Sequence, residues 1–287
     1  MTTDTTREPQ PSVVVVAAGD IVCGGPPPTS RECLHPVTAT LVEQIAPRAV
    51  LVLGDLQYDK GELANFQQYY DPTWGRFKSI TYPVPGNHEY EITGAPGYYD
   101  YFNGVGVDSG RAGHRARGWY AFTLGAWRII ALNSNCPQAG GCGPGSPQEQ
   151  WLRATLAASS ARCTLAYWHH PRFSAAGRSD STIAPLWKAL EDHRADLILA
   201  AHSHNYERFA PLTSAGVPDA ALGIPSFIVG TGGRSVHETA RTEVGLQVKE
   251  GKTFGVLRLV LKDGGFDWEF RAEPGSGFTD AGSATCH

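Results

Sequence analysis

The stretch VVVVAAGD at residues 13–20 decides the fold, because an apolar strand is followed at once by a glycine and a carboxylate. AVLVLGD at 49–55 repeats this order. Other apolar runs are followed by Asn, Glu or His, in ITYPVPGNHE at 80–89, TLAYWHH at 164–170 and DLILAAHSH at 196–204. In parallel α/β folds, ligands bind beyond the carboxyl ends of the strands. We therefore expect Asp, Asn and His side chains from separate segments to meet at one rim and form a metal site.

Each of these segments alone has an ordinary structural explanation. An Asp after a glycine is commonly a turn residue, an Asn before a His can cap a helix, and a His-x-His pair can occupy the two faces of a strand. The set taken together favours metal binding. A two-metal site needs many nitrogen and oxygen donors around closely spaced ions, and the neighbouring Gly and Pro residues allow the sharp turns that such a site requires.

Composition and charge exclude several other classes of protein. The chain has 287 residues, 41% of them hydrophobic, with Lys+Arg 24, Asp+Glu 28 and a net charge of −4. The charges are interspersed, so we expect no nucleic-acid partner. No apolar run approaches the roughly 18 residues that cross a bilayer, so no membrane span is predicted. Nothing in the sequence indicates an oligomeric state.

The remaining organisation is that of a mixed α/β protein. Residues 1–11 read as a disordered leader, and residues 12–287 as one domain without a dividing linker. Helices alternating with the strands predict βαβ units, and the last strands, without helices between them, predict an antiparallel section. The expected strands are 13–18, 49–53, 80–84, 121–124, 127–132, 164–168, 197–201, 226–229, 256–261 and 266–271. The expected helices are 37–45, 63–70, 147–158 with Ser146 as N-cap, and 183–193.

The six cysteines predict disulfides better than a structural zinc site, because they lack close CxxC pairs. Cys23 with Cys33 and Cys136 with Cys142 could close short rings, which leaves Cys163 for Cys286. Free buried thiols are the alternative, since sequence alone does not prove connectivity. Disulfides would place the protein in an oxidising compartment, secreted or periplasmic. The polar start MTTDTTREPQP is not a signal peptide, so a cytoplasmic protein is the other possibility unless a leader has been removed.

These motifs carry a family resemblance. The ordered series GD at 19–20, GDLQY at 54–58, GNHE at 86–89, YWHH at 167–170 and AHSHNYER at 201–208 resembles that of the calcineurin-like metallophosphoesterases, and specifically the purple acid phosphatase branch. The resemblance implies a four-layer α/β/β/α sandwich of two mixed sheets flanked by helices, and a dinuclear metal centre. The chain is too short for the extra N-terminal β domain of plant-type members, and it resembles the compact, single-domain bacterial type.

The resemblance also implies a division of the metal ligands. Asp20, Tyr58 and His204 would bind the first metal, Asn87, His169 and His202 the second, and Asp55 both. Carboxylates and a phenolate suit ferric iron at the first position, and an amide with two imidazoles suits Fe(II), Zn or Mn at the second. Two departures occur, Asp20-Ile21-Val22 where an Asp-x-Gly or Asp-x-His is common, and Ala201 where the family usually has Gly. Neither removes a ligand.

The expected reaction is phosphoester hydrolysis, most simply of a small phosphomonoester. Two cations polarise phosphoryl oxygens and lower the pKa of a bound water, which then attacks phosphorus as hydroxide. By resemblance His88 is the general acid or a substrate contact, and His170, Arg172 and Arg178 are candidate phosphate contacts. A phosphodiesterase acting on cyclic nucleotides or phospholipid headgroups is one alternative. A non-catalytic scaffold with the same fold is the other, and retention of the ligands argues against it.

Overall fold

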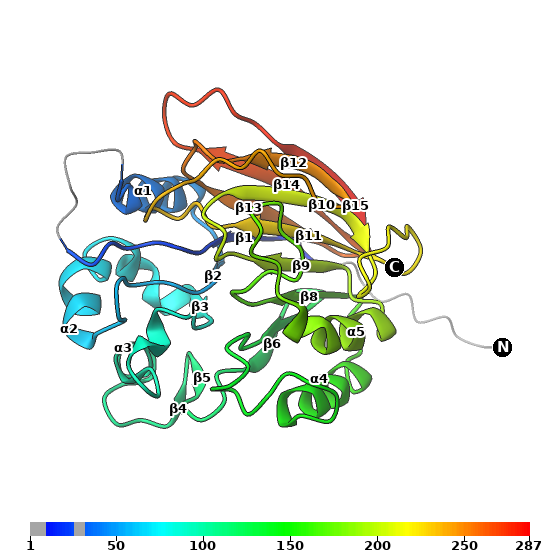
Figure 1. The fold of residues 1–287 in the computed structure, drawn as a ribbon, viewed down its shortest axis with the longest axis horizontal. Coiled ribbons are helices and arrows are strands. Elements are labelled where there is room, and N and C mark those ends of the chain that lie inside the picture. Colours follow the sequence, from blue (N-terminus) through cyan, green and yellow to red (C-terminus); the bar gives the residue numbers. More distant parts are fainter. Residues whose placement is uncertain (1–9, 26–31) are drawn as a thin grey trace.

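The computed structural model describes residues 10–25 and 32–287, and two large mixed sheets form its centre (Figure 1). The six-stranded sheet has the order β15-β14-β13-β1-β2-β3, and the seven-stranded sheet the order β12-β10-β11-β9-β8-β7-β6. The first sheet contains β1 (Val13–Ala18), β2 (Ala49–Val52), β3 (Thr81–Pro83), β13 (Gly255–Lys262), β14 (Gly265–Ala272) and β15 (Ala281–Thr285). The second contains β6 (Tyr120–Leu124), β7 (Trp127–Ala131), β8 (Cys163–Tyr167), β9 (Leu197–Ala200), β10 (Tyr206–Leu212), β11 (Ile224–Val229) and β12 (Leu246–Glu250).

The helices lie outside the sheets. Among the described residues they are α1 (His35–Ile45), α2 (Leu63–Asn65), α3 (Pro96–Asn103), α4 (Pro147–Ala157) and α5 (Ala184–Asp192). Figure 1 shows α4 and α5 together on one flank, away from α1, α2 and α3. A π-helical segment, Phe66–Tyr70, continues α2, and 3-10 turns occupy Trp74–Ile80, Glu89–Glu91 and Ser181–Ile183. No described helix is both long enough and apolar enough to cross a bilayer.

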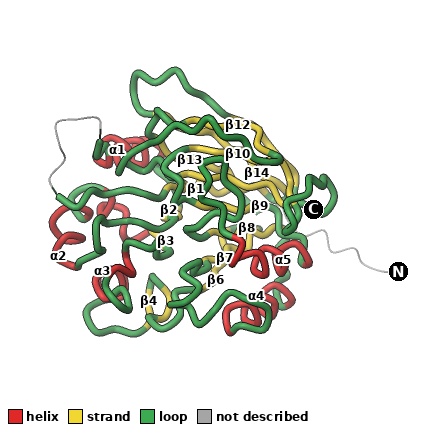
Figure 2. The backbone as a smooth tube through the Cα atoms, viewed as in Figure 1, coloured by secondary structure: helices red, strands yellow, loops and turns green. Residues whose placement is uncertain are grey.

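The strand sequences explain the layered packing. In β7 and β8, Ile129 and Leu165 belong to the core that contains residues of both sheets, whereas Ile130 and Ala166 belong to the core under α4 and α5. Successive residues of a strand face opposite sides, so a continuous apolar run fills both cores. The expected four-layer sandwich is therefore confirmed, with strands stacked at its centre (Figure 2).

The predicted helices and strands are found, and most of their ends are shifted by only one or two residues. The predicted N-cap is also found, because Ser146 accepts a hydrogen bond from the Glu149 amide, 3.3 Å away, at the start of α4. The antiparallel prediction needs a correction. β13 and β14 pair antiparallel, but β11 belongs to the other sheet and pairs parallel with β9. Strands β10, β12 and β15, the short β4 (Ser109–Gly110) and β5 (Gly113–His114), and helix α3 were not predicted.

All three predicted disulfides are formed: Cys23–Cys33, Cys136–Cys142 and Cys163–Cys286. Most of the predicted leader, and most of the loop between Cys23 and Cys33, falls on residues 1–9 and 26–31, which lie outside the described residues. The last disulfide joins β8 of the seven-stranded sheet to the segment that follows β15 of the six-stranded sheet. It therefore links the two sheets covalently.

Candidate metal centre

The predicted ligands come from the carboxyl ends of strands in both sheets. Asp20 follows β1, Asp55 follows β2, Asn87 follows β3, His169 follows β8 and His202 follows β9. These strands run parallel to one another within each sheet, β1 with β2 and β2 with β3 in one sheet and β8 with β9 in the other, so their carboxyl ends lie at a common edge. The sandwich thus brings residues that are far apart in the sequence into a single cluster.

The backbone turns sharply at three of these residues. Asp20, Asp55 and His202 have φ values of 57°, 48° and 65°, in the left-handed region that non-glycine residues seldom adopt. Gly54 and Gly86 also allow close approach, since a Cβ atom would lie 2.5 Å from the His169 ring at Gly54 and 2.1 Å from the Asp55 carboxylate at Gly86. Such strain concentrates at functional sites, where the surrounding structure holds it in place.

The first group of donors surrounds the phenol of Tyr58. Its Oη atom lies 2.9 Å from Asp20 Oδ1, 3.0 Å from Asp55 Oδ2 and 3.1 Å from His204 Nε2. The His204 Nε2 atom is also 3.2 Å from Asp20 Oδ1. Donor atoms about 3 Å apart have the separation expected around one ion with bonds of roughly 2.0–2.2 Å. This group therefore fits a cation that prefers anionic oxygen ligands.

The second group surrounds the Nε2 atom of His169. This atom lies 3.2 Å from Asn87 Oδ1, 3.2 Å from His202 Nδ1 and 3.2 Å from Asp55 Oδ2. Asp55 Oδ2 thus contacts both Tyr58 and His169, and it is the atom that the two groups share. The arrangement fits two neighbouring cations with the Asp55 carboxylate between them.

Hydrogen bonds from outside each group orient the ligands. His169 Nδ1 donates to the Leu53 carbonyl, 2.8 Å away, so Nε2 is the ring atom that remains to bind a metal. His204 Nδ1 lies 2.7 Å from Ser235 Oγ, which leaves Nε2 facing Asp20. The second Asp20 oxygen accepts a hydrogen bond from the His202 amide at 2.8 Å. The Asp20 carboxylate therefore belongs to the first donor group and also fixes the loop that carries His202 of the second donor group.

Glu89 of the GNHE motif holds the loops that carry Asp55 and Asn87. Its buried carboxylate accepts hydrogen bonds from the amides of Gly86 (2.7 Å), Leu56 (2.8 Å) and Asp55 (3.0 Å). Burial first, and then the nearby Asp55 charge, raises the pKa of Glu89 to about 7. This residue supports the ligands and is not one of them.

The electrostatics of the cluster favour a cation. Burial acts to raise the pKa of Asp55, but the facing His169 and His88 rings outweigh it and hold the pKa below its usual range. Burial likewise opposes a charge on His169, yet the Asp55 carboxylate raises the pKa of His169 to about 9. Burial, and then the neighbouring His169 and His170, lowers the pKa of His202 to about 3. The carboxylates thus stabilise positive charge at this place, and a metal must displace the His169 proton to bind.

His88 lies over the shared carboxylate without belonging to either group. Its amide donates to Asp55 Oδ1 at 2.9 Å, and its ring Nε2 lies 3.9 Å from Asp55 Oδ2. Nδ1 lies 2.6 Å from the Asp59 carbonyl and donates to it. The side chain is 29% exposed. The His88 ring therefore lies beside the shared carboxylate and is partly open to solvent.

The other predicted substrate contacts are placed differently from one another. The His170 ring lies 4.6 Å from the His202 ring between centroids, and Arg178 Nη1 lies 3.4 Å from His202 Nε2. Both residues are thus beside the cluster. Arg172 instead donates to the Ser214 carbonyl at 3.2 Å, and its guanidinium lies 4.5 Å from the Phe173 ring centroid. The structure shows no contact between Arg172 and the predicted ligands among the described residues.

Sequence reasoning missed residues that follow β11. Arg234 lies over the Tyr58 ring, Ser235 holds His204, and the His237 ring stacks on His204 with centroids 5.4 Å apart. The segment GTGGRSVH at 230–237 follows an apolar strand and contains several glycines, as the recognised motifs do. That signal could have identified it.

A sandwich of two mixed sheets with paired donor groups at their common edge defines a metallophosphoesterase. The family model described as calcineurin-like phosphoesterase matches residues 33–206, more than half of the chain. The chain therefore belongs to the calcineurin-like phosphoesterase family, a family of metal-dependent phosphoester hydrolases.

Relatives are found in both sequence and structure comparisons. Two uncharacterized proteins of Mycobacterium tuberculosis, from different strains, are each 34% identical over 211 residues, covering 64% of this chain and 39% of their own length. This chain thus spans about two fifths of those relatives.

Similar folds occur in solved structures that share little sequence with this chain. The purple acid phosphatase PPD1 of yellow lupin has a TM-score of 0.78 at 19% identity, covering 96% of this chain and 54% of its own. GAP50, the anchor in the inner membrane complex of Plasmodium, has a TM-score of 0.67 at 13% identity, covering 96% and 89%. PhoD has a TM-score of 0.64 at 14% identity, covering 96% and 68%.

Proposed function

We propose that the protein is a phosphomonoesterase of the purple acid phosphatase type. The observation that carries this proposal is the position of Tyr58, whose Oη lies within 3.1 Å of Asp20, Asp55 and His204. A phenolate with two carboxylates suits ferric iron at the first position, and the amide and imidazoles around His169 suit Fe(II), Zn or Mn at the second. When bound, these cations would polarise the phosphoryl oxygens and activate a water molecule for attack.

The side chains around the cluster have separate proposed roles. Arg178 and His170, beside His202, bind the non-reacting phosphoryl oxygens of the substrate. His88 supplies a proton to the leaving oxygen. Because its Nδ1–H donates to the Asp59 carbonyl, the Nε2 atom can donate only when the ring is an imidazolium. We therefore assign His88 as a general acid that acts in its protonated form.

Substrate comparison on metal-reconstituted protein tests the proposed function. We expect p-nitrophenyl phosphate to be hydrolysed with a higher kcat/KM than bis(p-nitrophenyl) phosphate. The reverse preference would favour a phosphodiesterase. No hydrolysis of either ester, with both metals bound, would favour a scaffold that uses the fold for binding alone. Because all three disulfides are formed, we also propose that the protein works in an oxidising, extracytoplasmic compartment.

A further inference from the structure

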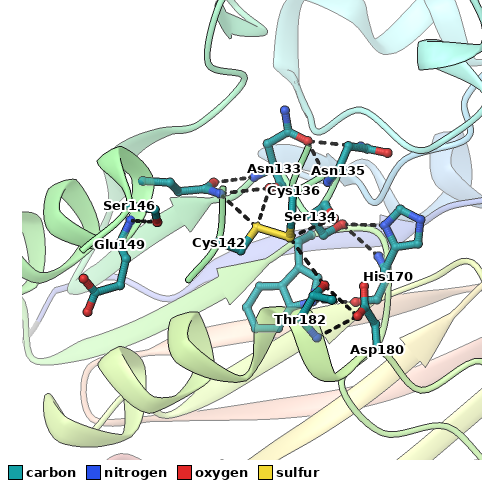
Figure 3. The surroundings of a disulfide bond; sticks show 12 residues. Asn133, Ser134, Asn135, Cys136, Cys142, Ser146, Glu149, His170, Asp180 and Thr182 are labelled. Carbon is teal, nitrogen blue, oxygen red and sulfur yellow. Dashed lines mark hydrogen bonds between the residues drawn. A yellow bond between two sulfur atoms is a disulfide. The ribbon is translucent and has the colours of Figure 1, made fainter. Parts of the chain in front are cut away.

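A pocket of about 520 Å3 lies beside the second donor group, with Cys136 of the Cys136–Cys142 disulfide in its lining. Figure 3 shows the surroundings of this disulfide. We call this cavity the disulfide pocket. Its lining includes Cys136, Pro137, Gln138, His170, Asp180 and Thr182. The disulfide and Pro137 supply apolar surface, and Asp180 and Thr182 face them from the segment that leads into α5.

The disulfide pocket shares its wall with the metal centre. His170, which lines the pocket, has its ring centroid 4.6 Å from that of His202. Ser134 Oγ accepts a hydrogen bond from the amide of His170 at 3.0 Å (Figure 3). It also accepts one from the amide of His169 at 3.3 Å. Asn135 Nδ2 donates at 3.1 Å to the carbonyl of Pro85, two residues before the ligand Asn87. A group held in the pocket is thus next to a phosphoryl group held at the second donor group.

The pocket carries a fixed negative charge. Asp180 Oδ1 accepts hydrogen bonds from the Thr182 amide at 2.8 Å and the Thr182 hydroxyl at 2.6 Å, which orient the carboxylate (Figure 3). Asp180 forms no ion pair with any residue in the described ranges. Burial lowers the pKa of Arg172, and the Asp180 charge opposes this shift. The Arg172 guanidinium nevertheless donates to the Ser214 carbonyl and forms no ion pair with Asp180. Within the described part of the chain, no lysine or arginine lines the pocket.

We propose that the disulfide pocket holds the leaving alcohol of the substrate and selects a small alcohol that carries a cationic ammonium group. This inference rests on the proposed phosphomonoesterase function. Water supplies the oxygen of the new P–O bond, the ester P–O bond breaks, and the alcohol leaves with a proton. The methylene and N-methyl groups of this alcohol pack on the disulfide and Pro137, while its ammonium group pairs with Asp180. The same carboxylate repels alcohols that carry a second anionic group.

Two nearly isosteric esters isolate the charge. Phosphocholine and 3,3-dimethylbutyl phosphate differ mainly in the positive nitrogen that replaces a carbon. We expect wild-type kcat/KM to be at least about tenfold higher for phosphocholine, in keeping with an ion pair near a protein surface. Asp180→Asn keeps an acceptor for Thr182 and removes the charge, so the ratio should fall close to one. Asp219→Asn is the matched control, because Asp219 also accepts backbone amides, from Ala221 and Leu222, in a loop that does not line the pocket.

Each result separates the pocket from the reaction. A wild-type ratio near one, or a high ratio that Asp180→Asn leaves unchanged, would overturn the inference while hydrolysis itself upholds the proposed function. If metal-loaded protein hydrolyses neither ester nor p-nitrophenyl phosphate, the proposed function fails. In that case, the binding of choline, followed through its N-methyl NMR signal, tests the pocket independently of the reaction. Binding at least about tenfold weaker in Asp180→Asn supports the inference, and equal binding or none overturns it.

Discussion

The guanidinium of Arg234 lies 5.3 Å from the ring centroid of Tyr58. The Tyr58 hydroxyl in turn contacts three predicted metal ligands, Asp20, Asp55 and His204. The His88 ring also packs on Tyr58, with centroids 4.2 Å apart. A cation over an aromatic face is attracted to its electrons, and the attraction increases when the ring becomes a phenolate. Burial, and then Asp20 and Asp55, raise the pKa of Tyr58 well above its usual value. The Arg234 guanidinium over the ring opposes them, because a positive charge favours the phenolate.

Colour tests this relationship directly. A phenolate on ferric iron gives a charge-transfer band, so iron-loaded wild-type protein should be coloured and Tyr58→Phe should be colourless with iron still bound. Arg234→Met should move the band to longer wavelength, because removing the cation raises the energy of the phenolate electrons. Arg234→Lys should move it less. Visible spectra at matched iron content provide the measurement, and a colourless wild-type protein with full iron occupancy would contradict the ferric assignment.

Asn87 should behave as a metal ligand. Its Oδ1 lies 3.2 Å from His169 Nε2, so Asn87→Ala removes one donor from the second group. We expect lower occupancy of the second metal and partial recovery of activity when that metal is supplied in excess. Metal analysis after dialysis, with activity measured against added metal, gives both readouts. Full occupancy in Asn87→Ala would show that this amide is not a ligand.

His88 should behave otherwise, although it is the next residue. His88→Ala keeps the backbone amide that donates to Asp55, so both metals should remain bound. The rate should fall roughly 100-fold to 10,000-fold if the ring is a general acid. The loss should be smaller for p-nitrophenyl phosphate than for an alkyl phosphate, because nitrophenolate leaves without a proton. Equal losses for the two esters at full metal content would instead assign His88 to the phosphoryl group.

Prediction from sequence worked where strands are buried on both faces. The runs that became β8 and β9 are continuous and buried because each face packs against a core, and predicted metal ligands follow both strands. The missed strands have weaker patterns. The edge strand β12 is LQVKE, with alternate residues exposed, and β15 is AGSAT, which has little apolar surface. Their pairing depends on neighbours that are distant in the sequence, and local pattern does not contain that information.

The candidate site was predicted unevenly for a similar reason. Ligand identities could be taken from motifs, because a metal needs particular donor atoms. The roles of Arg172 and Arg178 could not, since both occur in one polar loop and only its path in space directs Arg178 to His202 and Arg172 to Ser214. Arg234 was missed because its importance comes from packing on Tyr58, across a sequence separation that no local motif records.

Stability should fall in acid partly through His35. This residue is 2% exposed at the start of α1, and its Nδ1 atom has no hydrogen-bond partner among the described residues. Burial lowers the pKa of His35 from 6.5 to about 4. The folded state therefore favours the neutral His35 ring. The contribution of His35 to the free energy of unfolding is complete above pH 6.5 and declines as the pH falls toward 4. The slope of this contribution is at most about 1.4 kcal/mol per pH unit.

Replacing His35 isolates this effect. In His35→Gln the free energy of unfolding should depend less steeply on pH between 6.5 and 4 than in wild type, whatever its absolute value. Urea unfolding at several pH values measures the slope, and His114→Gln, at an exposed position, should keep the wild-type slope. An unchanged slope in His35→Gln would mean that the ring is protonated equally in the folded and unfolded states.

The disulfides should differ in what they contribute to stability. Cys163–Cys286 spans 123 residues and Cys136–Cys142 spans 6, and cross-linking a longer loop removes more conformational entropy from the unfolded chain. On the chain-entropy model, Cys163→Ser with Cys286→Ser should lower the free energy of unfolding by about 5 kcal/mol, and Cys136→Ser with Cys142→Ser by about 2 kcal/mol. Denaturant unfolding of the two double variants measures this difference. Equal losses would show that the link between the sheets stabilises the folded protein through local packing, because loop entropy alone predicts unequal ones.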